Sequence, residues 1–169
     1  MTMAISVSKR PRPLIQFSRF RWRALLRELG RRGQGRKEAG AFLLGRPGRD
    51  LFKVRRVVYL DDLDPTCLKG GIHFQGLAYS KLWDICAAGG LKVIGDVHTH
   101  PGSSVHQSSI DAENPMVSQA GHVALIVPYL ATRQVDPSQV GVHLYLGHDG
   151  WTTWTGPEAA MRLTLRILP

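Results

Sequence analysis

Residues 95–111 read GDVHTHPGSSVHQSSID and hold two histidines one residue apart, a proline directly after them, and a Ser-x-x-Asp group beyond a short polar loop. The apolar, β-branched segment at residues 91–97 predicts a buried strand that runs into His98. Because residues two apart on a strand point to the same face, we expect the imidazoles of His98 and His100 to lie side by side. Pro101 cannot donate to a strand ladder and therefore ends the strand.

The residues after the proline predict a reversal of the chain. Residues 102–107 form a polar loop, and residues 108–111 resemble a helix start that returns Asp111 toward the two histidines. Two imidazoles and one carboxylate suit Zn²⁺, and three protein ligands leave the fourth position open for water, as in catalytic sites. We therefore predict a catalytic metal site at His98, His100 and Asp111. The simpler alternative is that Ser-x-x-Asp is only a helix cap, which needs no metal.

The whole pattern resembles the signature of the JAB/MPN metalloprotease family, also called JAMM. Members of that family include zinc isopeptidases that remove ubiquitin, and bacterial relatives encoded beside ubiquitin-like conjugation enzymes. The family pattern places a glutamate on an earlier strand, ahead of H-[ST]-H-P-x6-S-x-x-D. This chain supplies every position of that pattern, namely Glu38, His98, Thr99, His100, Pro101, Ser108 and Asp111. The resemblance covers about residues 14–155.

The resemblance implies a role for the matching side chains. His98, His100 and Asp111 are expected to hold one zinc ion per chain. Glu38 is expected to act as the general base that takes a proton from water. Ser108 is expected to donate a hydrogen bond to the tetrahedral oxyanion.

The resemblance also implies a substrate, the amide bond after the C-terminus of a ubiquitin-like protein, cleaved in deconjugation or in precursor processing. The expected partners are that protein or its conjugates, and the activating and conjugating enzymes of the same operon. The chain has no long insertion of the kind that grips polyubiquitin in larger relatives, which favours a bacterial member, including one that serves in antiphage defence. The alternatives are a non-catalytic scaffold of the same fold, and a hydrolase of small-molecule amides or sulfur-carrier proteins.

Two residues of the motif region, Glu38 and Asp96, allow more than one interpretation. Glu38 opens a predicted buried strand at residues 38–44, where it is either the base or a strand-end residue that faces water. Asp96 stands where many relatives carry an aromatic residue. It either orients His98 through the free ring nitrogen or only meets a neighbouring strand or solvent. Thr99 points to the opposite face from both histidines, so we expect it to pack in the core.

Positive charge is concentrated at the N-terminal end. Residues 1–37 hold 11 of the 22 Lys and Arg residues and one acid, Glu28, for a net charge of +10. The remaining 132 residues carry 11 bases and 12 acids, for −1. The basic segment is a solvated helix face, a patch that docks an acidic protein, or a surface for nucleic acid or membrane. No nucleic-acid motif accompanies it, so we do not expect nucleic acid as the partner.

Length and composition fit one globular domain. The 169 residues, 43% hydrophobic and 21% charged, are enough to bury a sizeable core. Cys67 and Cys86 are too few for a disulfide framework or a thiolate zinc site, so we expect a reduced, cytoplasmic compartment. The N-terminus lacks an apolar signal core and the longest apolar run, residues 123–131, is interrupted by Pro128. We therefore expect no signal peptide and no membrane partner.

Hydrophobic patterning predicts a mixture of strands and helices without strict β-α-β alternation. Helices are expected at residues 18–29, 74–88 and 109–118, and strands at residues 14–17, 38–44, 50–60, 91–97, 122–130, 141–147 and 151–155. Gly30 is expected to end the first helix, followed by a mobile basic turn at residues 31–36. The acids at 61, 62 and 64 are expected in a turn and not in a metal cluster. Residues 161–167 alternate like a strand, while 158–163 could equally be helical.

These elements predict an α+β fold, a single JAB/MPN-type domain with a curved mixed β-sheet flanked by helices. The family resemblance implies a cytidine-deaminase-like α-β-α arrangement. We expect residues 1–13 to form a flexible basic arm and residues 14–169 to form the domain.

Overall fold

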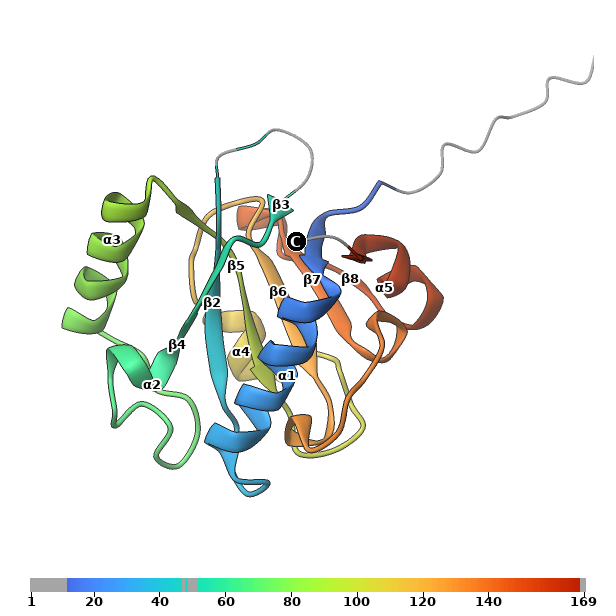
Figure 1. Ribbon diagram of the computed structural model, residues 1–169, viewed down its shortest axis with the longest axis horizontal. Helices are drawn as coiled ribbons and strands as arrows, with labels where there is room; N and C mark the ends of the chain where they lie inside the picture. The colour runs from blue at the N-terminus through green and yellow to red at the C-terminus, as the bar shows by residue number, and fades with distance from the viewer. Residues whose placement is uncertain (1–11, 47, 49–51, 168–169) are drawn as a thin grey trace, which may run out of the picture.

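The structure, a computed structural model, describes residues 12–46, 48 and 52–167 (Figure 1). Its strands are β1 (Ile15–Ser18), β2 (Gly40–Gly45), β3 (Phe52–Lys53), β4 (Arg56–Tyr59), β5 (Lys92–Thr99), β6 (Val123–Val127), β7 (Gly141–Tyr145), β8 (Trp151–Trp154) and β9 (Leu163–Arg166). Its α-helices are α1 (Arg19–Gly33), α2 (Leu60–Leu63), α3 (Leu77–Gly89), α4 (Ser109–Glu113) and α5 (Gly156–Arg162). Short 3₁₀ turns are η1 (Tyr129–Ala131), η2 (Pro137–Gln139) and η3 (Gly147–Asp149).

A mixed sheet forms the centre of the molecule. Its strand order is β4-β2-β5-β6-β7-β8, with β5 and β6 parallel and the other neighbours antiparallel. A smaller parallel sheet, β3-β1-β9, accompanies it. In Figure 1, α1 crosses the front of the main sheet, α4 lies behind it, and α3 stands beside β4. The predicted α+β class, a mixed sheet flanked by helices, is confirmed.

Helix α1 covers one face of the main sheet with an apolar stripe. Ser18 caps its start by accepting a backbone N–H through its side chain, and its buried residues include Trp22, Leu25, Leu26 and Leu29. The prediction that Gly30 ends this helix and opens a mobile turn is wrong, because the helix continues to Gly33. Gly30 serves close packing instead, since a Cβ there would lie 2.5 Å from the carbonyl oxygen of Ala131.

Helix α3 packs against the opposite face through aromatic side chains. Phe42 of β2 meets Phe74 edge to face, with ring centroids 5.2 Å apart, and Phe74 meets Tyr79 at 4.8 Å. The predicted helix at residues 74–88 begins one turn too early, since Phe74 lies in the preceding loop. Two of the apolar residues of α3, Leu77 and Trp83, are 82% and 46% exposed. The buried stripe of α3 is narrow because the helix covers only the margin of the sheet.

Several other predicted elements have different bounds. The strand predicted at residues 50–60 is two short strands in different sheets, with residues 50 and 51 outside the described residues. The helix predicted at 109–118 ends at Glu113, two residues before Pro115. The helix and the strand that were predicted as alternatives at the C-terminal end both occur, one after the other, as α5 and β9. The predicted arm at residues 1–13 lies almost wholly outside the described residues, so that boundary stays a prediction.

The acids at 61 and 62 lie in the short helix α2 and not in a turn. Arg32 of α1 reaches both, with Nη1 2.6 Å from Asp61 Oδ1 and 2.7 Å from Asp62 Oδ1. These acids therefore bind an arginine, and they belong to no group of metal-ligating residues in the described chain.

Both cysteines, Cys67 and Cys86, are buried free thiols. Within the described ranges, no helix combines the length and the apolar character needed to cross a bilayer.

Candidate metal centre

Strand β5 carries His98, and His100 follows at its end. Thr99, between them, is fully buried on the opposite face, as predicted. Two glycines allow the neighbouring strands to approach closely: a Cβ on Gly40 of β2 would lie 3.0 Å from the carbonyl oxygen of Val97 in β5, and one on Gly95 of β5 only 2.3 Å from a carbonyl oxygen of β6. The strand that carries the two imidazoles is therefore held tightly on both sides.

Helix α4 presents Asp111 through a capping box. The backbone N–H and the hydroxyl of Ser108 donate to Asp111 Oδ2 at 2.8 and 2.7 Å, and the Asp111 N–H donates to Ser108 Oγ at 3.1 Å. Trp151 of β8 anchors the helix by donating from Nε1 to the carbonyl of Ala112 at 3.0 Å. The helix-cap interpretation of Ser-x-x-Asp is correct, and the cap fixes the direction of the carboxylate.

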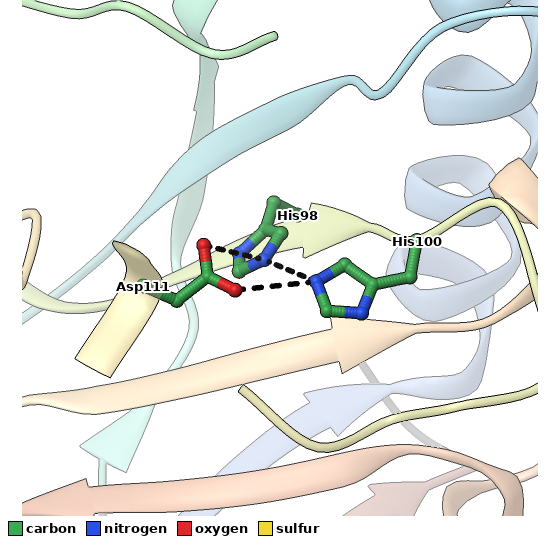
Figure 2. Close-up of side chains that lie close together, drawn as sticks. All are labelled: His98, His100 and Asp111. Carbon is green, nitrogen blue, oxygen red and sulfur yellow. Dashed lines mark hydrogen bonds and ion pairs between the residues drawn. The ribbon is translucent and has the colours of Figure 1, made fainter. Parts of the chain in front are cut away.

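The side chains of His98, His100 and Asp111 converge (Figure 2). The two Nε2 atoms lie 3.0 Å apart, Asp111 Oδ1 lies 3.6 Å from His98 Nε2, and Asp111 Oδ2 lies 3.4 Å from His100 Nε2. Tetrahedral zinc with ligands near 2.0–2.1 Å separates its ligand atoms by about 3.3 Å. The measured distances lie on both sides of that value, so the group can hold a metal ion. Among the described residues, no further His, Cys, Asp or Glu joins it.

The charges around this group favour a cation. Burial opposes protonation of His98, but the nearby carboxylates of Asp111 and Asp96 outweigh it and raise the pKa of His98 to about 9. Burial likewise opposes ionisation of Asp111, but His100, His98 and Ser108 hold the pKa of that carboxyl well below its usual range. Positive charge is therefore stabilised at the place where a divalent ion fits.

Glu38 lies on the neighbouring strand segment. Gly40 of β2 pairs with His98, and the Thr99 N–H donates to the carbonyl of Ala39 at 3.0 Å. Continuing this register sets Glu38 opposite His100, on the face that carries both imidazoles. The Thr99 hydroxyl accepts the Ala39 N–H at 3.0 Å and so locks the backbone beside Glu38. Glu38 is half-buried and is not one of the three grouped ligands, and its role as the base stays a prediction.

The predicted oxyanion role of Ser108 depends on its hydroxyl. In this structure the hydroxyl donates to Asp111, and the side chain is exposed beside a potential metal ligand. Donation to an oxyanion requires the hydroxyl to turn away from Asp111 when substrate binds, and this role stays a prediction.

Asp96 and His122 form a buried pair directly behind His98. They are 4% and 5% exposed, and His122 Nε2 donates to Asp96 Oδ1 at 2.5 Å. The second carboxylate oxygen, Oδ2, lies 4.0 Å from Nδ1 of His98. Burial opposes the charge of Asp96, yet His122 and His98 lower its pKa. Asp96 thus meets His122, next to the neighbouring strand β6, and its distance to His98 is longer than a hydrogen bond, so an orienting role for Asp96 stays a prediction.

The loop between His100 and Ser108 is held by a buried histidine of β7. His143 is fully buried, with Nδ1 2.8 Å from Thr153 Oγ1 and Nε2 3.0 Å from the carbonyl of Val105. A Cβ on Gly141 would lie 2.0 Å from the same carbonyl oxygen, so only glycine lets the loop lie this close. With the Nε2–H donating to Val105 and Nδ1 accepting from Thr153, both ring nitrogens of a neutral imidazole are satisfied.

A left-handed turn supports the other side of the loop. Tyr129, Leu130 and Ala131 have φ values of 58°, 52° and 52°, a conformation that costs energy in each non-glycine residue. The N–H of Leu130 donates to the carbonyl of His100 at 2.8 Å, and that of Tyr129 to Gly102 at 2.9 Å. The turn therefore fixes the backbone on which the second imidazole stands.

His143 should make stability depend on pH. Burial lowers the pKa of His143 from 6.5 to about 4. Because the folded-state pKa lies below the unfolded value, the unfolded state binds more protons as the pH falls, and stability is lost between these two values. At pH 5 the loss attributable to this residue is about 2 kcal/mol. We expect the unfolding free energy, measured by urea unfolding, to fall between pH 7.5 and pH 5.0 in the parent protein. In the variant His143→Gln this fall should be smaller by the same amount. Equal drops in both proteins would contradict the assignment.

Two supporting residues of the site, His122 and His143, escaped sequence reasoning. Both were placed at or within predicted buried strands, where a polar side chain needs a partner. A histidine in a buried strand was therefore a signal that a hydrogen-bond partner exists. The partners of His122 and His143 are Asp96 and Val105, which are 26 and 38 residues away in the chain. Only the sheet register reveals them.

Comparisons with known proteins support the fold. No protein-family profile matches the chain. It is similar to protein DSY2949 from Desulfitobacterium hafniense, whose solution structure matches with 20% identity and a TM-score of 0.63 over 90% of this chain and 93% of that one. It also matches AF2198, a JAB1/MPN domain protein from Archaeoglobus fulgidus, with 18% identity and a TM-score of 0.44 over 89% and 98% of the two chains. The likeness to DSY2949 shows a shared fold. Any assignment of function must therefore rest on the residues of the site.

Proposed function

We propose that this chain is a zinc-dependent amide hydrolase of the JAB/MPN type that cleaves the bond after the C-terminus of a ubiquitin-like protein. The observation that carries the proposal is the convergence of His98, His100 and Asp111 at distances that suit one tetrahedral ion. The sequence order and spacing of these residues resemble the JAMM signature, and the glutamate required by that signature lies on the adjacent strand segment.

The proposed chemistry assigns separate roles to the ion, Glu38, Ser108 and Asp111. His98, His100 and Asp111 would hold the Zn²⁺ ion, which in such an open site would supply a water molecule with a pKa of about 7 and a Lewis acid for the scissile carbonyl. Glu38 takes the proton of the attacking water and passes it to the departing amine. Ser108 donates a hydrogen bond to the oxyanion. Asp111 carries the negative charge that would balance the ion, and the backbone N–H of Ser108, which donates to its carboxylate, keeps it in place when the hydroxyl turns to the oxyanion.

The proposed substrate class rests on the family resemblance. The extended C-terminal tail of a ubiquitin-like protein is suited to strand-like binding through main-chain hydrogen bonds. The proposed setting is a bacterial ubiquitin-like conjugation system, including one in antiphage defence, with its activating and conjugating enzymes as neighbours in the cytoplasm. Both deconjugation and precursor processing use the same bond.

The test is a cleavage assay on a ubiquitin-like protein carrying a C-terminal extension. We expect the zinc-loaded protein to release the extension, the chelated protein to be inactive, and added Zn²⁺ to restore activity. Metal binding without cleavage of any amide would favour the non-catalytic scaffold. Cleavage of small acyl amides or sulfur-carrier fusions, but not of the ubiquitin-like fusion, would retain the chemistry and replace the substrate.

Asp96 should act as a positioning residue for His98. A carboxylate behind a metal-binding histidine orients the ring, and its loss typically weakens metal binding by 10–100-fold. We expect Asp96→Asn to weaken Zn²⁺ binding by about tenfold or more, and His122→Gln to weaken it to a smaller extent because Asp96 remains. Competition with a chromogenic chelator measures both affinities. Lower thermal stability with unchanged zinc affinity would show that the pair is merely structural.

A further inference from the structure

The arginines of helix α1 differ in their partners from one end of the helix to the other. In the last turn, Arg31 and Arg32 are neutralised by Glu28 and by two acids of α2. Arg19, Arg23 and Arg27 follow one another at intervals of four residues and therefore form a row along the helix. Within the described residues, none of these three guanidinium groups makes an ion pair or a side-chain hydrogen bond. The positive charge of α1 is therefore largely neutralised in its last turn and available along the row before it.

These three arginines line a groove of about 980 Å³. Its opposite side is formed by the segment that includes η2 and by α5 and β9, with Leu163 and Leu165 among the lining residues. Among the lining residues there is a single acid, Asp136. No member of the metal site lines the groove, so the groove is a separate feature of the surface.

The groove also includes an open sheet edge. Strand β9 is the last strand of the small sheet and pairs with β1 on one side only among the described strands. An edge strand offers main-chain N–H and C=O groups to an extended chain. A groove that combines such an edge with a row of arginines suits a peptide, because a nucleic acid has no backbone that can join a sheet.

The spacing of the arginines indicates what the peptide carries. Residues four apart on a helix rise by about 6 Å, and alternate side chains of an extended peptide are about 6.8 Å apart. Acidic residues at every second position of an extended segment would therefore meet successive arginines. The guanidinium group is well suited to carboxylates because it can form two parallel hydrogen bonds with each.

We propose that this groove is a docking site for an extended acidic segment of a partner protein, with carboxylates at alternate positions bound by Arg19, Arg23 and Arg27. The proposal goes beyond the proposed hydrolase activity and does not depend on the metal. It gives the basic N-terminal region one of the roles that the sequence left open, the docking of an acidic protein.

Fluorescence anisotropy with a labelled nine-residue peptide that has glutamate at alternate positions tests this proposal. We expect saturable binding to the full chain, and at least tenfold weaker binding to the triple variant Arg19→Ala/Arg23→Ala/Arg27→Ala. The variant Arg36→Ala/Arg55→Ala/Arg56→Ala removes the same charge from exposed positions outside the groove and should bind within twofold of the parent. Circular dichroism establishes that both variants are folded.

Two competitors identify the occupant. A peptide with glutamine in place of glutamate should bind at least tenfold more weakly, and a single-stranded oligonucleotide of equal charge should not displace the acidic peptide at equal concentration. Equal binding of the acidic peptide to the parent and the groove variant, or no binding to either, would overturn the proposal. Tighter binding of the oligonucleotide, lost in the groove variant, would assign the surface to nucleic acid and would also overturn it.

Discussion

Glu38→Gln is expected to lower the rate of amide cleavage by about 10²–10⁴-fold, because general acid–base catalysis contributes a factor of this size. The substitution keeps the size and hydrogen-bonding capacity of the side chain but removes its ability to accept the proton of water. Glu38 is not one of the grouped ligands, so zinc affinity should change little. Single-turnover cleavage of the ubiquitin-like fusion, measured beside a zinc titration, separates the two effects.

Glu158→Gln provides the matched control for this prediction. Glu158 is an exposed acid in α5, and the same chemical change there should leave cleavage within twofold of the parent. Cleavage by the Glu38 variant at the parent rate would remove Glu38 from the mechanism, while the metal centre itself would stand.

Asp111→Asn is expected to abolish activity through loss of the metal. The carboxylate is the only anionic member of the three-residue group. Substitution of a residue that supports a metal ligand from behind typically weakens metal binding by roughly 10–100-fold, and loss of the ligand itself should weaken zinc binding by more than that. Asparagine can still accept the Ser108 cap through its amide oxygen, so α4 should remain folded and stability should fall by no more than about 1 kcal/mol. Isothermal titration with Zn²⁺ and urea unfolding measure the two quantities.

The neighbouring acid on the same helix is the control for Asp111. Glu113 is exposed on α4 and has no place in the ligand group. Glu113→Gln should therefore bind zinc with parental affinity. If Asp111→Asn also bound zinc like the parent, the ion would not use this carboxylate.

Local patterns in the sequence were enough to predict that His98, His100 and Asp111 lie together. The one-residue spacing of His98 and His100 follows from strand alternation, and Ser-x-x-Asp encodes a helix cap within four residues. Strand β2 was recognisable from its apolar run, and the mixed character of the sheet followed from the order of elements. In each case the determining interactions lie within a few residues of one another.

Features that depend on distant contacts were predicted poorly. Helix α1 continues past Gly30, and this glycine leaves room for the backbone of Ala131, a distant residue in the sequence that nothing near Gly30 indicates. The apolar residues Leu77 and Trp83 are exposed because α3 lies at the margin of the sheet, a position that periodicity does not reveal. The partners of Asp96 and the loop contact of His143 likewise depend on strand order.

A crystal of the zinc-loaded protein, with diffraction measured on both sides of the zinc absorption edge, tests the central claim most directly. The account predicts one anomalous peak per chain, about 2.0–2.1 Å from Nε2 of His98, Nε2 of His100 and one oxygen of Asp111. A peak held by other residues, or no peak in crystals grown with excess zinc, would contradict it.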